Sequence, residues 1–127
     1  MTEYSGGSDE LKILAVSNHT GVLEELEREL SGFYPEAEII TETDALMAGK
    51  YAFNHEVDIV FAEADMKRMN GFQLIQFVRQ EHPRVRSYLI GAEKELSESV
   101  LSGAEDVTGV LHYPLEENAV REILIRS

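Results

Sequence analysis

The chain has 127 residues, a formal net charge of -13 and no cysteine. A chain of this length forms one domain that buries about two thirds of its unfolded surface without disulfides or metals. The absence of cysteine excludes thiolate zinc sites and thiol chemistry, and it favours a reducing compartment, so we expect the protein to be cytoplasmic. Because the acidic charge repels nucleic-acid phosphates and anionic lipids, we expect this segment neither to bind nucleic acid directly nor to associate with membranes.

Strand and helix patterns alternate along the chain. Residues 1–10 are small and polar with no hydrophobic period, so we predict a flexible N-terminal lead there and a single domain over 11–127. Apolar runs predict five strands at 11–16, 37–41, 58–62, 87–90 and 109–112. Apolar residues at helical spacing predict a helix after each strand, at about 20–30, 45–54, 70–82, 95–106 and 115–125.

Capping residues predict where several of these helices begin and end. We expect Thr20 to cap the first helix and Thr43 or Asp44 to cap the second. Asn70 opens the third helix and Pro83 ends it.

Five strands that alternate with five helices predict an α/β fold, a doubly wound parallel sheet with helices on both faces. The flavodoxin-like strand order 2-1-3-4-5 fits best, because it places the most apolar strands, the first and third, inside the sheet. Ligand chemistry in such sheets gathers at the carboxyl ends of the strands. Glu63 and Asp65 follow the central strand, so we expect them at that edge.

Four motifs resemble a known family, the receiver domains of bacterial response regulators. They are Ile13-Leu14-Ala15-Val16, Asp58-Ile59-Val60, Met69-Asn70-Gly71-Phe72 and Tyr113-Pro114-Leu115, which resemble that family's strand one, strand three, turn before helix three and strand-five exit. The intervals from Glu63 to Gly91 and from Gly91 to Tyr113 also resemble the family spacing. The resemblance covers residues 11–125 and implies a domain of two-component signalling.

The chain departs from this family at each position to which the resemblance assigns phosphoryl chemistry. Ser17 and Asn18 stand in place of the acidic pair that holds magnesium, and neutral oxygens bind that ion poorly. Glu63 aligns with the phosphoacceptor aspartate, and its extra methylene moves the carboxylate out of in-line geometry. Gly91 replaces the strand-four hydroxyl residue, and Tyr113 replaces the strand-five lysine.

Further positions around this pocket differ from the family as well. Val110 aligns with the strand-five aromatic that reports the switch, and it is too short and too stiff at χ1 for that role. Asp65 aligns with the residue that offers magnesium a backbone carbonyl, and we expect its side chain to pair with Lys67 or Arg68.

Aromatic and histidine residues also flank this region in the sequence. We expect the ring of Tyr113 to lie over the emptied pocket, and the resemblance implies a cis peptide bond before Pro114. His19 and His112 lack metal-ligand spacing, so we expect structural or surface roles for both.

Together these replacements predict a pseudo-receiver, which keeps the scaffold, is not phosphorylated and acts through protein contacts without a metal or cofactor. No nucleophile, base and oxyanion site occur together, so we predict no catalytic residues and no enzyme. By resemblance, the contact surface is the face formed by residues 95–106, 109–112 and 115–125. We expect Arg121 and Ile125 on it to contact a partner or a second copy.

Three alternatives stay open at this point. Glu63 either mimics a phosphorylated state or is an inert replacement. The chain is alternatively the N-terminal regulatory domain of a DNA-binding transcription regulator whose output domain lies beyond residue 127. It is alternatively a small flavin-binding module, because the loop Ser17–Gly21 contains a few of the Ser, Thr and Gly residues in which a phosphate-binding loop is rich.

Overall fold

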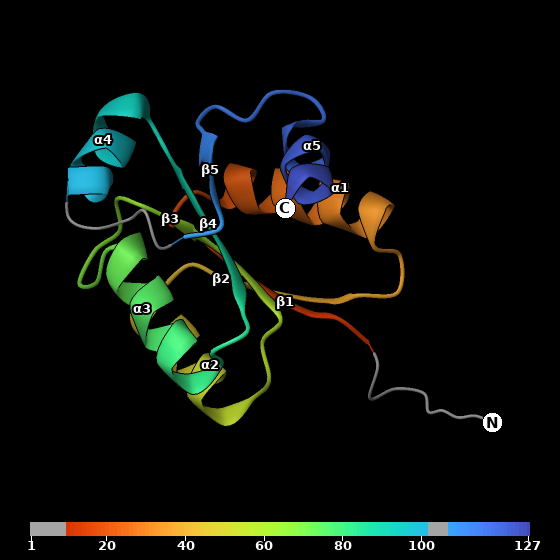
Figure 1. Ribbon diagram of the computed structural model, residues 1–127, viewed down its shortest axis with the longest axis horizontal. Coiled ribbons are helices and arrows are strands. Elements are labelled where there is room, and N and C mark those ends of the chain that lie inside the picture. Colours follow the sequence, from red (N-terminus) through yellow and green to blue (C-terminus); the bar gives the residue numbers. More distant parts are fainter. Residues whose placement is uncertain (1–9, 102–106) are drawn as a thin grey trace.

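The computed structural model describes residues 10–101 and 107–127 (Figure 1). Most of the predicted N-terminal lead and the end of the predicted fourth helix lie outside these residues. Within the described residues, no helix combines the length and the hydrophobicity that crossing a membrane requires.

A single sheet of five parallel strands confirms the predicted doubly wound fold. The strands are ordered β2-β1-β3-β4-β5, which is the flavodoxin-like order expected from the sequence (Figure 1). Their bounds are β1 Lys12–Val16, β2 Glu38–Glu42, β3 Ile59–Glu63, β4 Arg86–Gly91 and β5 Gly109–His112. Strand β3 lies at the centre, and all five of its residues are buried.

Helices cover both faces of the sheet (Figure 1). One face packs against α1 (Thr20–Phe33) and α5 (Ala119–Arg126), and the other packs against α2 (Ala45–Asn54), α3 (Gly71–Glu81) and α4 (Glu93–Leu101). Alternate strand residues point to opposite faces, so Ile13 and Ala15 join the α1–α5 core while Leu14 and Val16 join the α2–α3 core. Because both faces are covered, the inner strands β1 and β3 are mostly apolar runs in the sequence.

Asp44 and Asn70 cap their helices as the sequence predicted. The Asp44 carboxylate accepts the Leu46 N–H, and Asn70 forms a reciprocal capping box with Gln73. The prediction for Thr20 is wrong, because the N-cap of α1 is His19, whose side chain makes no capping bond.

The last helix is shorter at its N-terminus than predicted. It begins at Ala119 rather than at residue 115. Asn118 has a φ of 67°, in the left-handed region, so a right-handed helix cannot continue back through it.

A half-buried acidic residue of α1 lies beside α5. Both carboxylate oxygens of Glu29 are shielded from water, and within the described residues neither has a hydrogen-bond partner. Burial, followed by the nearby Glu25 carboxyl, raises the pKa of Glu29 to about 7 from the ordinary value of 4.5.

We therefore expect stability to fall as pH rises from 4.5 to about 7, because the folded state favours the protonated carboxyl more than the unfolded chain does. Glu29→Gln removes this penalty. At pH 8 it should stabilise the protein by about 1–2 kcal/mol, a gain that is limited because an ionised Glu29 turns partly toward water. At pH 4.5 the gain should be close to zero, because Glu29 is then already protonated in the folded state. Urea unfolding of this variant and of Glu27→Gln, a change at an exposed position of α1, measures the difference. An equal gain at both pH values would contradict the prediction.

Candidate functional site

Strands β1, β3, β4 and β5 bring the predicted site positions to one edge of the sheet. Glu63 ends β3 and pairs with Ile90 of β4, one residue before Gly91. Ser17 follows β1, and Tyr113 follows β5 with its N–H donating to the Gly91 carbonyl at 2.9 Å. The parallel register therefore gathers residues that are far apart in sequence, as predicted.

The Glu63 carboxylate is buried, with 6% of the residue exposed, and is surrounded by donors from the β1–α1 loop. The Ser17 hydroxyl donates to its Oε1 at 2.6 Å, and the Asn18 N–H donates to the same oxygen at 3.2 Å. The His19 Nδ1 lies 2.9 Å from Oε2 and 3.1 Å from Oε1. The Ser17 oxygen also accepts the His19 N–H at 3.0 Å. Three consecutive residues thus hold this one carboxylate.

His19 joins this site although the sequence predicted only a structural or surface role for it. Its ring stacks on Tyr113 with a centroid separation of 5.7 Å and an interplanar angle of 16°. Tyr113 is 43% exposed, and its peptide bond to Pro114 is cis as predicted. One sequence feature could have indicated this contact: His19 lies in the loop after the first strand, at the same edge of the sheet where Glu63 was expected.

Arg68 does not form the predicted pair with Asp65. Its guanidinium lies 3.6 Å from the Asp44 carboxylate at the start of α2, while Asp65 is exposed. Arg68 has a φ of 71°, a left-handed backbone conformation that no local sequence pattern indicated.

Space beside Gly91 is already occupied by another side chain. A Cβ at Gly91 would lie 3.1 Å from Glu95 Oε1 and 3.3 Å from the Ala64 Cβ. Glu95 Oε1 also accepts the Ala92 N–H at 3.0 Å. Val110 is exposed on β5, so the position of the family's switch aromatic carries a short side chain at the surface.

The donors around Glu63 do not fit the magnesium ion that the resemblance implies. Magnesium prefers several carboxylate and water oxygens, whereas Ser17 and Asn18 are neutral and already bind Glu63. Across residues 10–101 and 107–127, no three His, Asp or Glu side chains are grouped closely enough to hold a metal ion.

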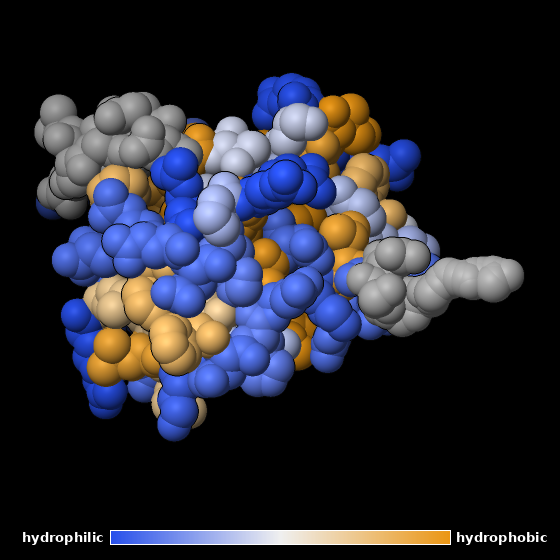
Figure 2. All heavy atoms as spheres, turned by 60° about the horizontal axis from the view of Figure 1, so that its bottom comes forward, coloured by the Kyte–Doolittle hydropathy of each residue, from blue (hydrophilic) through white to orange (hydrophobic). Residues whose placement is uncertain are grey.

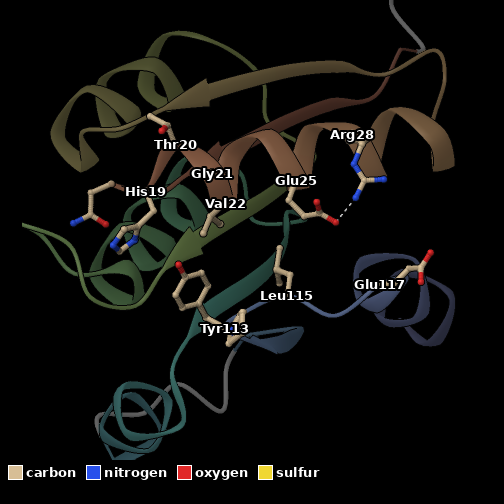
Figure 3. A pocket seen from close by; sticks show the side chains of 11 residues that line it. His19, Thr20, Gly21, Val22, Glu25, Arg28, Tyr113, Leu115 and Glu117 are labelled. Carbon is tan, nitrogen blue, oxygen red and sulfur yellow. Dashed lines mark hydrogen bonds and ion pairs between the residues drawn. The ribbon is translucent and has the colours of Figure 1, made fainter.

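A groove of about 750 Å³ lies beside the residues that surround Glu63, between the first turns of α1 and the β5–α5 connection (Figure 3). Figure 3 shows Tyr113 and Leu115 on one side and Val22 and Glu25 on the other. Arg28 pairs with Glu25 and lowers the pKa of that carboxyl. Among the described residues that line the groove, the Arg28 guanidinium is thus already paired with a carboxylate, which disfavours the binding of a phosphate group.

Comparison with solved structures places the fold among response-regulator receivers. The Vibrio cholerae chemotaxis protein CheY4 is similar at a TM-score of 0.78 and 21% identity, over 92% of this chain and 98% of that one. The REC domain of AraT, a response regulator from Geobacillus stearothermophilus, is similar at a TM-score of 0.80 and 22% identity, over 91% of both chains. The chain therefore has the receiver-domain fold of two-component response regulators.

A curated relative is also named as a response regulator. Stress response regulator protein 1 of Lodderomyces elongisporus is 34% identical over 70 residues, which are 55% of this chain and 19% of that protein. The match thus spans about a fifth of the relative. No family model matches the chain.

Proposed function

We propose that this chain is a phosphorylation-independent receiver-type domain that acts through protein contacts. The observation that supports this proposal best is the state of Glu63. Its carboxylate is buried and held by Ser17, the Asn18 N–H and His19. A carboxylate that attacks a phosphoryl donor needs a free oxygen in line with the donor, and both Glu63 oxygens have partners.

The surrounding charges also favour this proposal. A phosphoryl group brings negative charge that needs nearby cations. Tyr113 and Gly91 supply no positive charge where the family has a lysine and a hydroxyl. The His19 ring already contacts the Glu63 carboxylate.

Of the two interpretations of Glu63, we favour the inert one. In a phosphorylated receiver, the phosphoryl group contacts the strand-four and strand-five residues, which are Gly91 and Tyr113 here. The Glu63 carboxylate is instead bound by residues of the β1–α1 loop. Glu63 then acts as an anchor that orders the loop Ser17–His19. In this proposal the carboxylate has a structural role and carries no signal.

Treatment with acetyl phosphate and magnesium is expected to leave the mass of the protein unchanged. The reason is that the site lacks both the metal carboxylates and a free acceptor. Intact-mass spectrometry of the parent and of Asp65→Asn measures this. An added phosphoryl group on the parent would sink the proposal, and its loss in Asp65→Asn would identify Asp65 as the acceptor.

We further propose that the contact surface is the face formed by α4, β5 and α5. Two exposed apolar residues support this, Val110 on β5 and Ile125 on α5, which is 62% exposed. Strand β5 is also an edge strand, with one side unpaired in the sheet. Arg121 is exposed on the same helix as Ile125.

The double variant Arg121→Asp/Ile125→Asp should convert any dimer of the protein to monomer, because it removes an apolar contact and places like charges across a two-fold axis. Sedimentation velocity over a concentration series measures the change. A dimeric parent whose sedimentation is unaffected by the double variant would move the interface to another face.

Two other functions remain as proposals with weaker support. An N-terminal regulatory domain joined to a DNA-binding domain is in keeping with the curated relative, of which the match is only a small part. Reading the gene beyond the codon for Ser127 tests it. A flavin module is disfavoured because the loop donors from Ser17 and Asn18 already bind Glu63, whose charge would repel a flavin phosphate. Flavin absorbance in the purified protein would revive it.

A further inference from the structure

A second surface of the molecule carries an apolar groove between α2 and α3. This α2–α3 groove has a volume of about 290 Å³ and is lined by Leu46, Gly49, Lys50, Phe53, Met69 and Phe77. Its walls come from two helices and from the loop before α3. It is distinct from the Glu63 pocket and from the face formed by α4, β5 and α5.

Helix α2 places its large apolar side chains outward, which is the reverse of the usual arrangement. The residues it buries are small, namely Ala45, Ala48, Gly49 and Ala52. Leu46, Met47 and Phe53 are 43%, 50% and 63% exposed. Figure 2, in which the α2–α3 end comes forward, shows a hydrophobic patch bordered by hydrophilic atoms. A patch of this kind on a soluble domain marks an interaction site.

Charge indicates what would bind there. Lys50 is the one charged residue of helix α2, and the groove lining contains no acid. The whole chain carries a net charge of -13, yet the charged side chain that lines this groove is a lysine. A carboxylate beside an apolar anchor would therefore pair with Lys50, because the groove lining supplies this cation and no competing acid.

Size indicates how large the bound segment is. A groove of about 290 Å³ accommodates one or two large apolar side chains rather than a broad surface. Short amphipathic helices bind such grooves through anchors spaced three or four residues apart.

We propose that the α2–α3 groove binds an amphipathic helical segment of a partner protein, with two large apolar anchors one turn apart and an adjacent carboxylate that pairs with Lys50. Leu46 and Phe53 line it from α2, and Phe77 lines it from α3. The groove acts independently of the Glu63 pocket and gives the domain a second contact surface.

Selection from a displayed library of random peptides of about 14 residues, or four helical turns, tests this against the whole chain. Enriched peptides should carry two large apolar residues three or four positions apart and an acidic residue beside them. Their affinity should fall about tenfold or more for Leu46→Ser/Phe53→Ser and for Lys50→Glu. The matched control for the charge reversal is Arg84→Glu, because Arg84 is exposed and does not line the groove, so this change should not affect binding.

Amide NMR spectra of each variant establish that it is folded, and the exposure of Leu46, Lys50 and Phe53 makes all three changes tolerable. Enriched peptides that bind all variants equally would overturn the proposal. So would a selection that yields no peptide dependent on the groove, or peptides indifferent to Lys50→Glu. A dimer that Leu46→Ser/Phe53→Ser abolishes would also overturn it, because the groove would then belong to a second copy.

Discussion

Replacing Gly71 with alanine is expected to destabilise the protein by at least about 3 kcal/mol, which is a large share of the stability of a domain this size. A Cβ at this position would lie 2.2 Å from the backbone oxygen of Glu63 and 2.8 Å from its carbonyl carbon. Both atoms belong to the buried central strand, so neither can move aside. The Gly71 N–H also donates to the Ala64 carbonyl at 3.1 Å, which fixes the start of α3 close to the end of β3.

Gly32→Ala is the matched control for this change. Gly32 lies in α1, and a Cβ there would meet no atom within 4 Å. Because alanine favours the helix, this variant should be more stable by about 0.5–1 kcal/mol. Urea unfolding of both variants measures the contrast. If Gly71→Ala unfolded at the same urea concentration as the parent, the close packing of α3 on Glu63 would be refuted.

Rebuilding the family's phosphorylation residues should produce a protein whose stability depends on magnesium. The five changes are Ser17→Asp, Asn18→Asp, Glu63→Asp, Gly91→Thr and Tyr113→Lys. They place three carboxylates together at the edge of the sheet and remove the Ser17 and Asn18 side chains, so the folded state should lose about 2–4 kcal/mol in chelator. Magnesium should restore much of this loss, because it binds the folded state only.

Two of the five substitutions place a larger side chain where the structure leaves little room, those at Ser17 and Gly91. Ser17 is fully buried, so an aspartate there depends on the metal. Threonine at Gly91 needs Glu95 to withdraw, which its flexible side chain allows. Thermal melting with and without magnesium measures the response. A variant that carries only the changes at Glu63, Gly91 and Tyr113 is the control, because it lacks the metal carboxylates.

A five-site variant that showed no rise in melting temperature with magnesium would mean that Glu63 does not occupy the acceptor position. Phosphorylation of this variant is a separate readout from the conformational response. Val110 still lacks the ring of the family's switch aromatic, so we expect phosphorylation without the full response unless Val110→Tyr is added.

The sequence by itself determined the fold and the edge of the sheet at which Glu63 lies. Continuous apolar runs identified the buried strands, and helical spacing identified the covering helices, because burial on both faces of a parallel sheet requires those patterns. The strand pattern predicted the position of Glu63 at the carboxyl edge of the sheet, and the resemblance to receiver domains assigned Ser17, Gly91 and Tyr113 to the same region. Asp44 and Asn70 were predicted as caps because capping depends on residues a few positions apart.

Only the tertiary structure decided how the side chains at that edge are paired. The contact of His19 with Glu63 joins residues from two strands' ends, and it depends on the register of the sheet rather than on any local pattern. The pairing of Arg68 with Asp44 depends on a left-handed backbone at Arg68. The α2–α3 groove depends on how closely two helices pack, because periodicity shows which face of a helix is apolar but not whether a neighbour covers it.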